Sequence, residues 1–173
     1  MQRLKAAVLI GVVCVCTMAA GAPRVRALSD RTARLLFEAS QRSPTIAQLL
    51  AMIEQSDVIL QIELAFEPGV PTAVTRLVTA AGDVRYVRVT INPAHSFFRK
   101  VELLGHELQH VAEIAADTSV RDQEGMRDLF VRIGDPAGAR GTFETDAAVQ
   151  VERRVRADLS AQVRTSSRRE PTS

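Results

Sequence analysis

Hydrophobic residues follow two different spacings along this chain, and the change between them marks out the elements. Helical spacing begins at Pro44, a favourable first-turn residue, with Ile46, Leu49 and Ile53 three to four positions apart. From residue 58 the period becomes two, which predicts strands over residues 58–64, 73–80 and 84–91. The last two strands are joined around Gly82, as expected for a hairpin.

Helical spacing returns after residue 92 and continues to the C-terminal region. It predicts helices over residues 99–117, 123–133 and 143–163, and a weaker amphipathic stretch covers residues 31–40. A helix, three strands and then further helices form an α+β layout. We therefore expect a short antiparallel β-sheet packed against C-terminal helices.

The N-terminus has the anatomy of a secretory signal peptide. Arg3 and Lys5 precede an apolar run over residues 6–20, which is short for a membrane-spanning helix, and small residues follow it. We expect an exported protein, secreted or periplasmic, with residues 1–22 as the signal peptide or, if uncleaved, as a membrane anchor. Residues 23–42 are interpreted as a linker and a short helix, 43–164 as the main domain, and 165–173 as a disordered tail.

Removal of the signal segment changes the composition. The chain has 22 basic and 20 acidic residues, so losing Arg3 and Lys5 leaves 20 of each. Since no charge surplus remains, composition gives no indication of nucleic acid binding. Both cysteines, Cys14 and Cys16, also lie in the signal segment, which leaves the main domain without a disulfide or a thiolate metal ligand.

The strongest chemical signal is the motif His106-Glu107-Leu108-Gln109-His110 within a predicted helix. At about 100° per residue, the two histidines lie about 40° apart and can bind one metal ion. Glu107 is then placed to take a proton from a metal-bound water. The apolar residues of this helix fall on the opposite side (Val101, Leu104, Leu108, Val111). The pattern predicts a zinc site.

A third ligand is needed, and three carboxylates are candidates, of which Asp146 falls on the wrong side of its helix. Glu144 lies within the apolar arc of the last helix, where a carboxylate is costly unless a cation neutralises it. Glu113 shares the histidine face but lies one turn beyond His110, which favours a second-shell or surface role. We expect zinc to be held by His106, His110 and Glu144, with Glu113 as the alternative.

The motif with a later glutamate resembles the gluzincin group of zinc metallopeptidases, in a small secreted bacterial form. The resemblance implies a zincin-like catalytic domain over residues 43–164, with His106, His110 and Glu144 as ligands and Glu107 as general base. One departure is Ala148, four positions after Glu144, where the thermolysin-like pattern has an Asp that supports a histidine. The expected activity is hydrolysis of a peptide or protein substrate.

Further roles and alternatives remain open. Tyr86 and His95 are candidates for stabilising the oxyanion. Residues 84–91, or the hairpin partner, could align an extended peptide by main-chain pairing. A catalytically inactive zincin-like module that binds zinc and an envelope partner is the main alternative. A helical interaction protein without a metal is the other.

Overall fold

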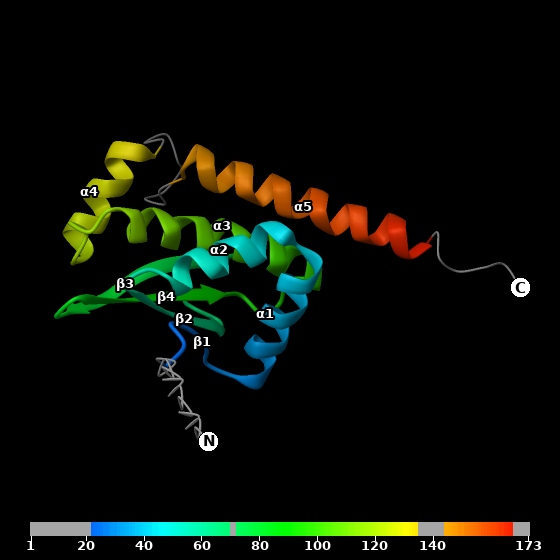
Figure 1. Cartoon of the computed structure of the whole chain (residues 1–173), viewed down its shortest axis with the longest axis horizontal. Coiled ribbons are helices and arrows are strands. Elements are labelled where there is room, and N and C mark those ends of the chain that lie inside the picture. Colours follow the sequence, from blue (N-terminus) through cyan, green and yellow to red (C-terminus); the bar gives the residue numbers. More distant parts are fainter. Residues whose placement is uncertain (1–21, 70–71, 135–143, 168–173) are drawn as a thin grey trace, which may run out of the picture.

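The computed structural model describes residues 22–69, 72–134 and 144–167, and the backbone alone for the last three. Nine elements are present in this part of the chain, and they confirm the α+β class (Figure 1). They are β1 (Val25–Ala27), α1 (Asp30–Arg42), α2 (Pro44–Glu54), β2 (Val58–Leu64), β3 (Ala73–Ala81), β4 (Val84–Ile91), α3 (Phe97–Ala116), α4 (Gln123–Ile133) and α5 (Asp146–Ser167).

The predicted signal peptide and most of the predicted tail lie outside the described residues, because residues 1–21 and 168–173 are not among them. In the described part, no helix is both long and apolar enough to cross a membrane. Helix α5 extends to Ser167, so it includes the first residues of the stretch interpreted as a tail. Likewise, the stretch interpreted as a linker contains strand β1.

The expected antiparallel sheet is wrong in part, because the sheet is mixed with the order β1-β2-β4-β3. Only the β3–β4 hairpin is antiparallel, whereas β1 pairs with β2 and β2 pairs with β4 in parallel. The chain can pair β1 and β2 in parallel because helices α1 and α2 form the crossover between them. After β2 the chain runs back along β3, at the edge of the sheet, and then forward again along β4, which lies between β3 and β2.

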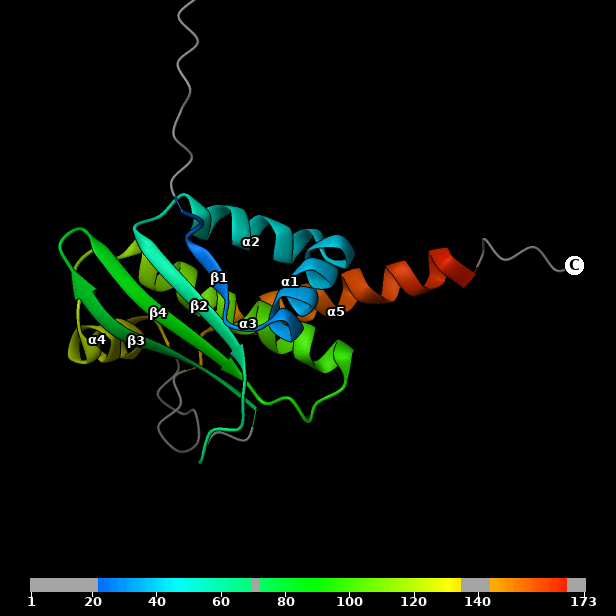
Figure 2. The same ribbon diagram turned by 90° about the horizontal axis from the view of Figure 1, so that it is seen from below.

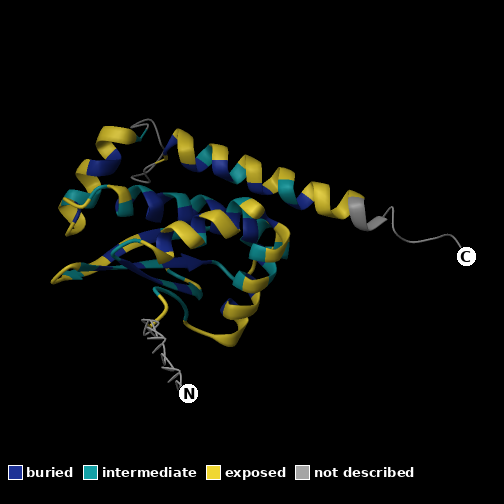
Figure 3. Ribbon diagram, viewed as in Figure 1, coloured by how far each residue is buried: buried dark blue, intermediate teal, exposed yellow. Residues whose placement is uncertain are grey.

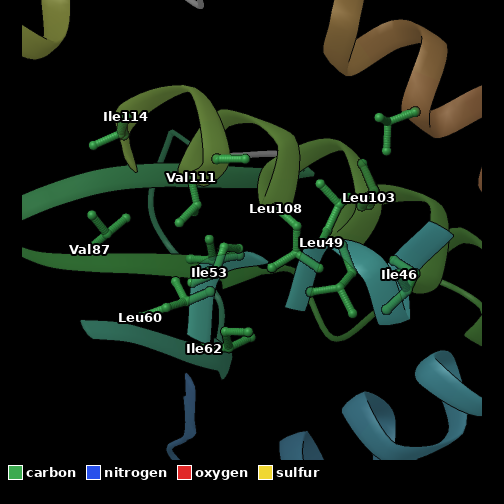
Figure 4. Close-up of a cluster of buried hydrophobic side chains, with 14 of the residues drawn as sticks. Ile46, Leu49, Ile53, Leu60, Ile62, Val87, Leu103, Leu108, Val111 and Ile114 are labelled. Carbon is green, nitrogen blue, oxygen red and sulfur yellow. The ribbon is translucent and has the colours of Figure 1, made fainter. Parts of the chain in front are cut away.

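The helices cover one face of the sheet (Figures 1 and 2). Inward side chains of β2 and β4 meet α2 and α3 in a core that Figure 4 shows, including Leu60, Ile62, Val87, Leu108 and Val111. Helix α5 packs on the far side of α3, so α3 lies between the sheet and α5, and the buried residues gather between these layers (Figure 3). The motif helix is therefore held from two sides.

The close approach of α3 and α5 depends on Gly105. A Cβ atom there would lie 2.7 Å from Val155 Cγ2 and 3.3 Å from Ile46 Cδ1. Valine side chains are stiff, and Val155 is fully buried, so the contact cannot relax freely.

We expect Gly105→Ala to lower the free energy of unfolding by about 1–3 kcal/mol, the usual cost of overpacking a core. Gly125→Ala is the matched control, because a Cβ atom there meets only ordinary contacts, the nearest at 3.4 Å. Urea unfolding followed by circular dichroism measures both. Equal stability of the two variants would contradict the close contact between α3 and α5.

Arg85 is a fully buried cation that faces inward from β4. Its Nε and Nη2 atoms donate to both carboxylate oxygens of Asp57 at 2.8 and 2.6 Å. Its Nη1 and Nη2 atoms also donate to backbone carbonyls at the end of α3 and in the turn that follows. This guanidinium thereby joins the sheet to the C-terminus of the motif helix.

The same ion pair predicts an acid-dependent loss of stability. Its hydrogen bond to Arg85 holds the pKa of Asp57 below the ordinary value of 3.8. Because the folded pKa is lower than the unfolded one, the pair stabilises the fold above the unfolded pKa, and this contribution disappears as the pH falls through the folded pKa. We expect the stability difference between wild type and Asp57→Asn to shrink as the pH is lowered below about 4. Urea unfolding at each pH measures both proteins.

Candidate functional site

Helix α3 presents the motif on the side that faces a cavity rather than the sheet. Its N-cap is Ser96, whose side chain accepts a hydrogen bond from the backbone N–H of Arg99. Leu104 and Leu108 are fully buried, whereas the His106 side chain keeps 13% of its surface exposed. The helical wheel thus placed the motif correctly relative to the core.

The two motif histidines face each other. Their Nε2 atoms are 3.1 Å apart, and the rings meet edge to face with centroids 4.8 Å apart. His110 also packs edge to face against Phe130 of α4, with ring centroids at 5.1 Å. Both Nε2 atoms therefore point at the same region, as two ligands of one ion must.

Each histidine has a carboxylate on the opposite side of its ring. The Nδ1 atom of His110 is 2.9 Å from Glu113 Oε2, and Glu113 Oε1 accepts a hydrogen bond from Thr145 at 2.8 Å. The Nδ1 atom of His106 is 3.4 Å from Glu152 Oε2, without hydrogen-bond geometry. When Nδ1 donates to a carboxylate, the ring is fixed with its Nε2 lone pair free. Glu113 thus lies behind His110, on the side of the ring away from His106.

Glu144 lies against His106, with Oε1 at 3.1 Å from Nε2. Its predicted location was wrong, because it precedes α5 instead of lying on its apolar stripe, and 49% of its side chain is exposed. The reason is that Thr145 caps the helix by accepting a hydrogen bond from the backbone N–H of Ala148. Glu144 therefore reaches the histidines from the segment before the helix.

Glu107 is almost fully buried between α3 and the edge strand. Its Oε2 atom accepts a hydrogen bond from the Thr75 hydroxyl at 2.6 Å. Burial raises the pKa of Glu107, and the Thr75 hydrogen bond and the nearby histidines oppose this rise. With a raised pKa, the Glu107 carboxylate accepts a proton more readily than an exposed carboxylate does.

One cavity with a volume of about 360 Å³ is lined by the two histidines, Glu107 and Glu144. Its walls come from the start of β3, from α3 and α4, and from the segment around Glu144. Arg99 and Glu152 add charged groups, whereas Leu103, Met126 and Phe130 add an apolar wall. The cavity is large enough for a side chain of a substrate beside the histidine pair.

The residues fit zinc by donor type. Two imidazole nitrogens and one carboxylate oxygen are common zinc ligands, and donors of a tetrahedral site lie about 3.3 Å apart. The two contacts of 3.1 Å at His106 Nε2 agree with that spacing. Among the described residues, however, no group of three or more His, Cys, Asp or Glu side chains already surrounds a common ion position. Binding would therefore require these side chains to rearrange, and Glu144 is the most exposed of the three, at 49%.

The two oxyanion candidates do not line this cavity. Tyr86 alternates with Arg85 and Val87 along β4, so its side chain lies on the sheet face away from α3. His95 lies in the turn before α3, and its Nε2 atom is buried without a hydrogen-bond partner. The structure therefore does not bring either residue to the histidine pair.

The sequence pattern did not indicate that Thr75, Glu152 or Thr145 belongs to the site. Thr75 contacts Glu107 only because β3 is the edge strand beside α3, which the strand pattern alone does not reveal. Glu152 had a readable signal, since it lies four positions after the buried Ala148 on the same helix and so borders its apolar stripe. Glu152 lies next to the buried stripe that contains Val151 and Val155, so its side chain can face α3.

Comparisons with known proteins leave the family open: no family model, curated protein or solved structure matches this chain.

Proposed function

We propose that this protein is an exported zinc-dependent metallohydrolase that cleaves peptide bonds. The observation that carries the proposal is the position of His106 Nε2, which lies 3.1 Å from both His110 Nε2 and Glu144 Oε1. The buried carboxylate of Glu107 is adjacent, in the same cavity. His106, His110 and Glu144 would hold the zinc ion, and export would depend on the signal segment over residues 1–22.

The charge of the cavity supports a divalent cation. Its lining includes the carboxylates of Glu107, Glu144 and Glu152 and one guanidinium, that of Arg99. Ionised carboxylates that lie close together repel one another, and a bound cation removes this cost. Since Glu152 is already paired with Arg99 and Arg156, a dication here would offset the charges of Glu107 and Glu144.

The chemical work falls to Glu107. His106, His110 and Glu144 would hold a zinc ion, which would lower the pKa of the attacking water. Glu107 accepts a proton from the attacking water and passes it to the leaving nitrogen of the substrate. The Thr75 hydroxyl holds Oε2 of that carboxylate, which leaves Oε1 as the oxygen available for the proton.

Strand β3 offers a place for the substrate main chain, and β4 is excluded from this role because it is paired on both sides. The carbonyl of Thr72 accepts from Asn92, so it points towards β4. By alternation, the backbone groups of Ala73 and Thr75 face the free edge. Both residues line the cavity, so an extended peptide added at this edge would pass the histidines.

The function is tested with the zinc-loaded full chain and a broad peptide library analysed by mass spectrometry. We expect cleavage that a chelator abolishes and that added zinc restores. A chain that binds zinc stoichiometrically but cleaves no peptide would be the inactive zinc-binding module. A chain that binds no zinc would contradict the metal site itself.

The third ligand is tested by two alanine variants. Glu144→Ala should weaken zinc binding by more than about 100-fold, because it removes a direct ligand, whereas Glu113→Ala should weaken it by about 10–100-fold, the usual effect of losing a histidine's supporting partner. Competition with a chromogenic chelator measures both affinities. The reverse ranking would assign the third ligand to Glu113.

A further inference from the structure

The face of the sheet opposite the helices carries a row of arginines. Arg26 of β1 is paired with Gln61, Gln61 with Arg88 of β4, and Arg88 with Arg76 of β3. These residues alternate with inward core residues, so their side chains project from the uncovered face, which is turned towards the viewer in Figure 2. Three cations therefore lie in one line across the four strands.

This arrangement is unfavourable for the isolated fold. Arg88 and Arg76 are directly opposite each other on neighbouring strands, where like charges repel. Arg76 is neutralised by an ion pair with Glu67. Within the described residues, Arg88 donates only to the Gln61 side chain and Arg26 only to a backbone carbonyl, and the Nε atom of Arg88 is buried without a partner. Two guanidiniums thus remain available for an anion.

An exposed apolar side chain and the apolar N-terminal sequence indicate which kind of anion these arginines suit. Leu28 comes directly after β1, two positions beyond Arg26, and it is 45% exposed. The apolar run of the sequence ends at residue 20, and β1 begins at Val25. An arginine close to an exposed apolar residue, as Arg26 is to Leu28, suits the boundary between lipid headgroups and acyl chains.

We propose that the open sheet face docks on a membrane surface rich in anionic phospholipid, with Arg26 and Arg88 binding the headgroup phosphates. The planar guanidinium matches phosphate oxygens with two parallel hydrogen bonds. The same face lies across the sheet from the cavity, so docking leaves the histidine pair accessible. The inference does not depend on the proposed hydrolase activity, and its test involves no zinc.

The protein contains its own probe for this face. Tyr86 is the sole tyrosine of the chain, there is no tryptophan, and it lies two positions before Arg88 on the same side of β4. The full chain is mixed with vesicles of phosphatidylcholine alone or with one quarter phosphatidylglycerol, both containing a lipid that carries a nitroxide quencher. We expect Tyr86 fluorescence to be quenched strongly only with phosphatidylglycerol, and the quenching to decrease at high salt.

The double variant Arg26→Gln and Arg88→Gln should raise the lipid concentration for half-maximal quenching by roughly 25-fold, at about fivefold for each arginine. Arg153→Gln with Arg154→Gln removes the same charge from the exposed face of α5 and should leave quenching unchanged. Lysine at positions 26 and 88 should preserve quenching, which separates charge from folding. Equal quenching in both vesicle types, or quenching indifferent to the glutamine variant, would overturn the proposal. A response of Tyr86 to poly-glutamate without lipid quenching would also overturn it and would assign the face to an acidic protein.

Discussion

Replacing Glu107 with Gln is expected to lower kcat/KM for peptide cleavage by roughly 10²- to 10⁴-fold, the usual contribution of a general base. Gln keeps the shape of the side chain, and its carbonyl oxygen can still accept the Thr75 hydrogen bond, but it cannot take the proton. Zinc content should be unchanged, because Glu107 is not among the proposed ligands. Steady-state assays on a cleaved library peptide, with metal analysis of both proteins, measure the two effects.

Glu107→Gln is not expected to lose activity through unfolding. A buried carboxylate is costly, so a neutral amide at this position should leave the free energy of unfolding unchanged or higher. Glu124→Gln, the same change at an exposed position of α4, serves as the control and should retain full activity. Cleavage by Glu107→Gln at the wild-type rate would remove Glu107 from the mechanism while leaving the zinc site intact.

Replacing Arg85 with Met should destabilise the protein by about 3–5 kcal/mol, the cost of breaking a buried ion pair by removing one partner. The variant leaves the Asp57 carboxylate without its cation, and it leaves the carbonyls of Ile114 and Asp117 without the donor that reaches them at 2.6 and 2.7 Å. Since domains of this size are stable by about 5–15 kcal/mol, the loss is a large fraction of the total.

Arg88→Met on the same strand is the matched comparison, because it makes the same chemical change on the open face. It should alter stability by less than about 1 kcal/mol, as is usual for partly exposed positions. Urea unfolding followed by circular dichroism gives both values. If the two variants were equally stable, the network at the end of α3 would contribute nothing to the fold.

The strands illustrate what the sequence could reveal. Residues 58–64 and 84–91 were predicted with the bounds that β2 and β4 have, because a strand with one buried face imposes an alternating pattern. The pairing of β2 with β4 was not predicted, because alternation identifies a buried face but not the neighbour of a strand. Arg85 shares its parity with Val87 and Val89, so its inward direction was readable, although its partners were not.

The site was predictable to the extent that it lies within one helix. The four-residue spacing of His106 and His110 predicted that their side chains lie together, and their Nε2 atoms do face each other. Glu113 lies three positions after His110, and it contacts the Nδ1 atom of that ring. Glu144 was predicted to lie near the histidines, but on the assumption that it belongs to the last helix. That helix boundary was incorrect, because the capping role of Thr145 was not recognised. The contact of Thr75 with Glu107 depends on strand order, which only the folded chain determines.

The strand order also has a consequence for how the chain reaches its native state. Strand β4 is paired with both β2 and β3, although it follows both in the chain. The β3–β4 hairpin is a local contact that can form within microseconds, whereas parallel pairing with β2 must close a longer loop. During synthesis, β2 therefore emerges from the ribosome well before the strand that completes its pairing. Until β4 has emerged, the edge of the apolar strand β2 that later pairs with β4 is open to other chains. This stage of folding is therefore the one most exposed to aggregation.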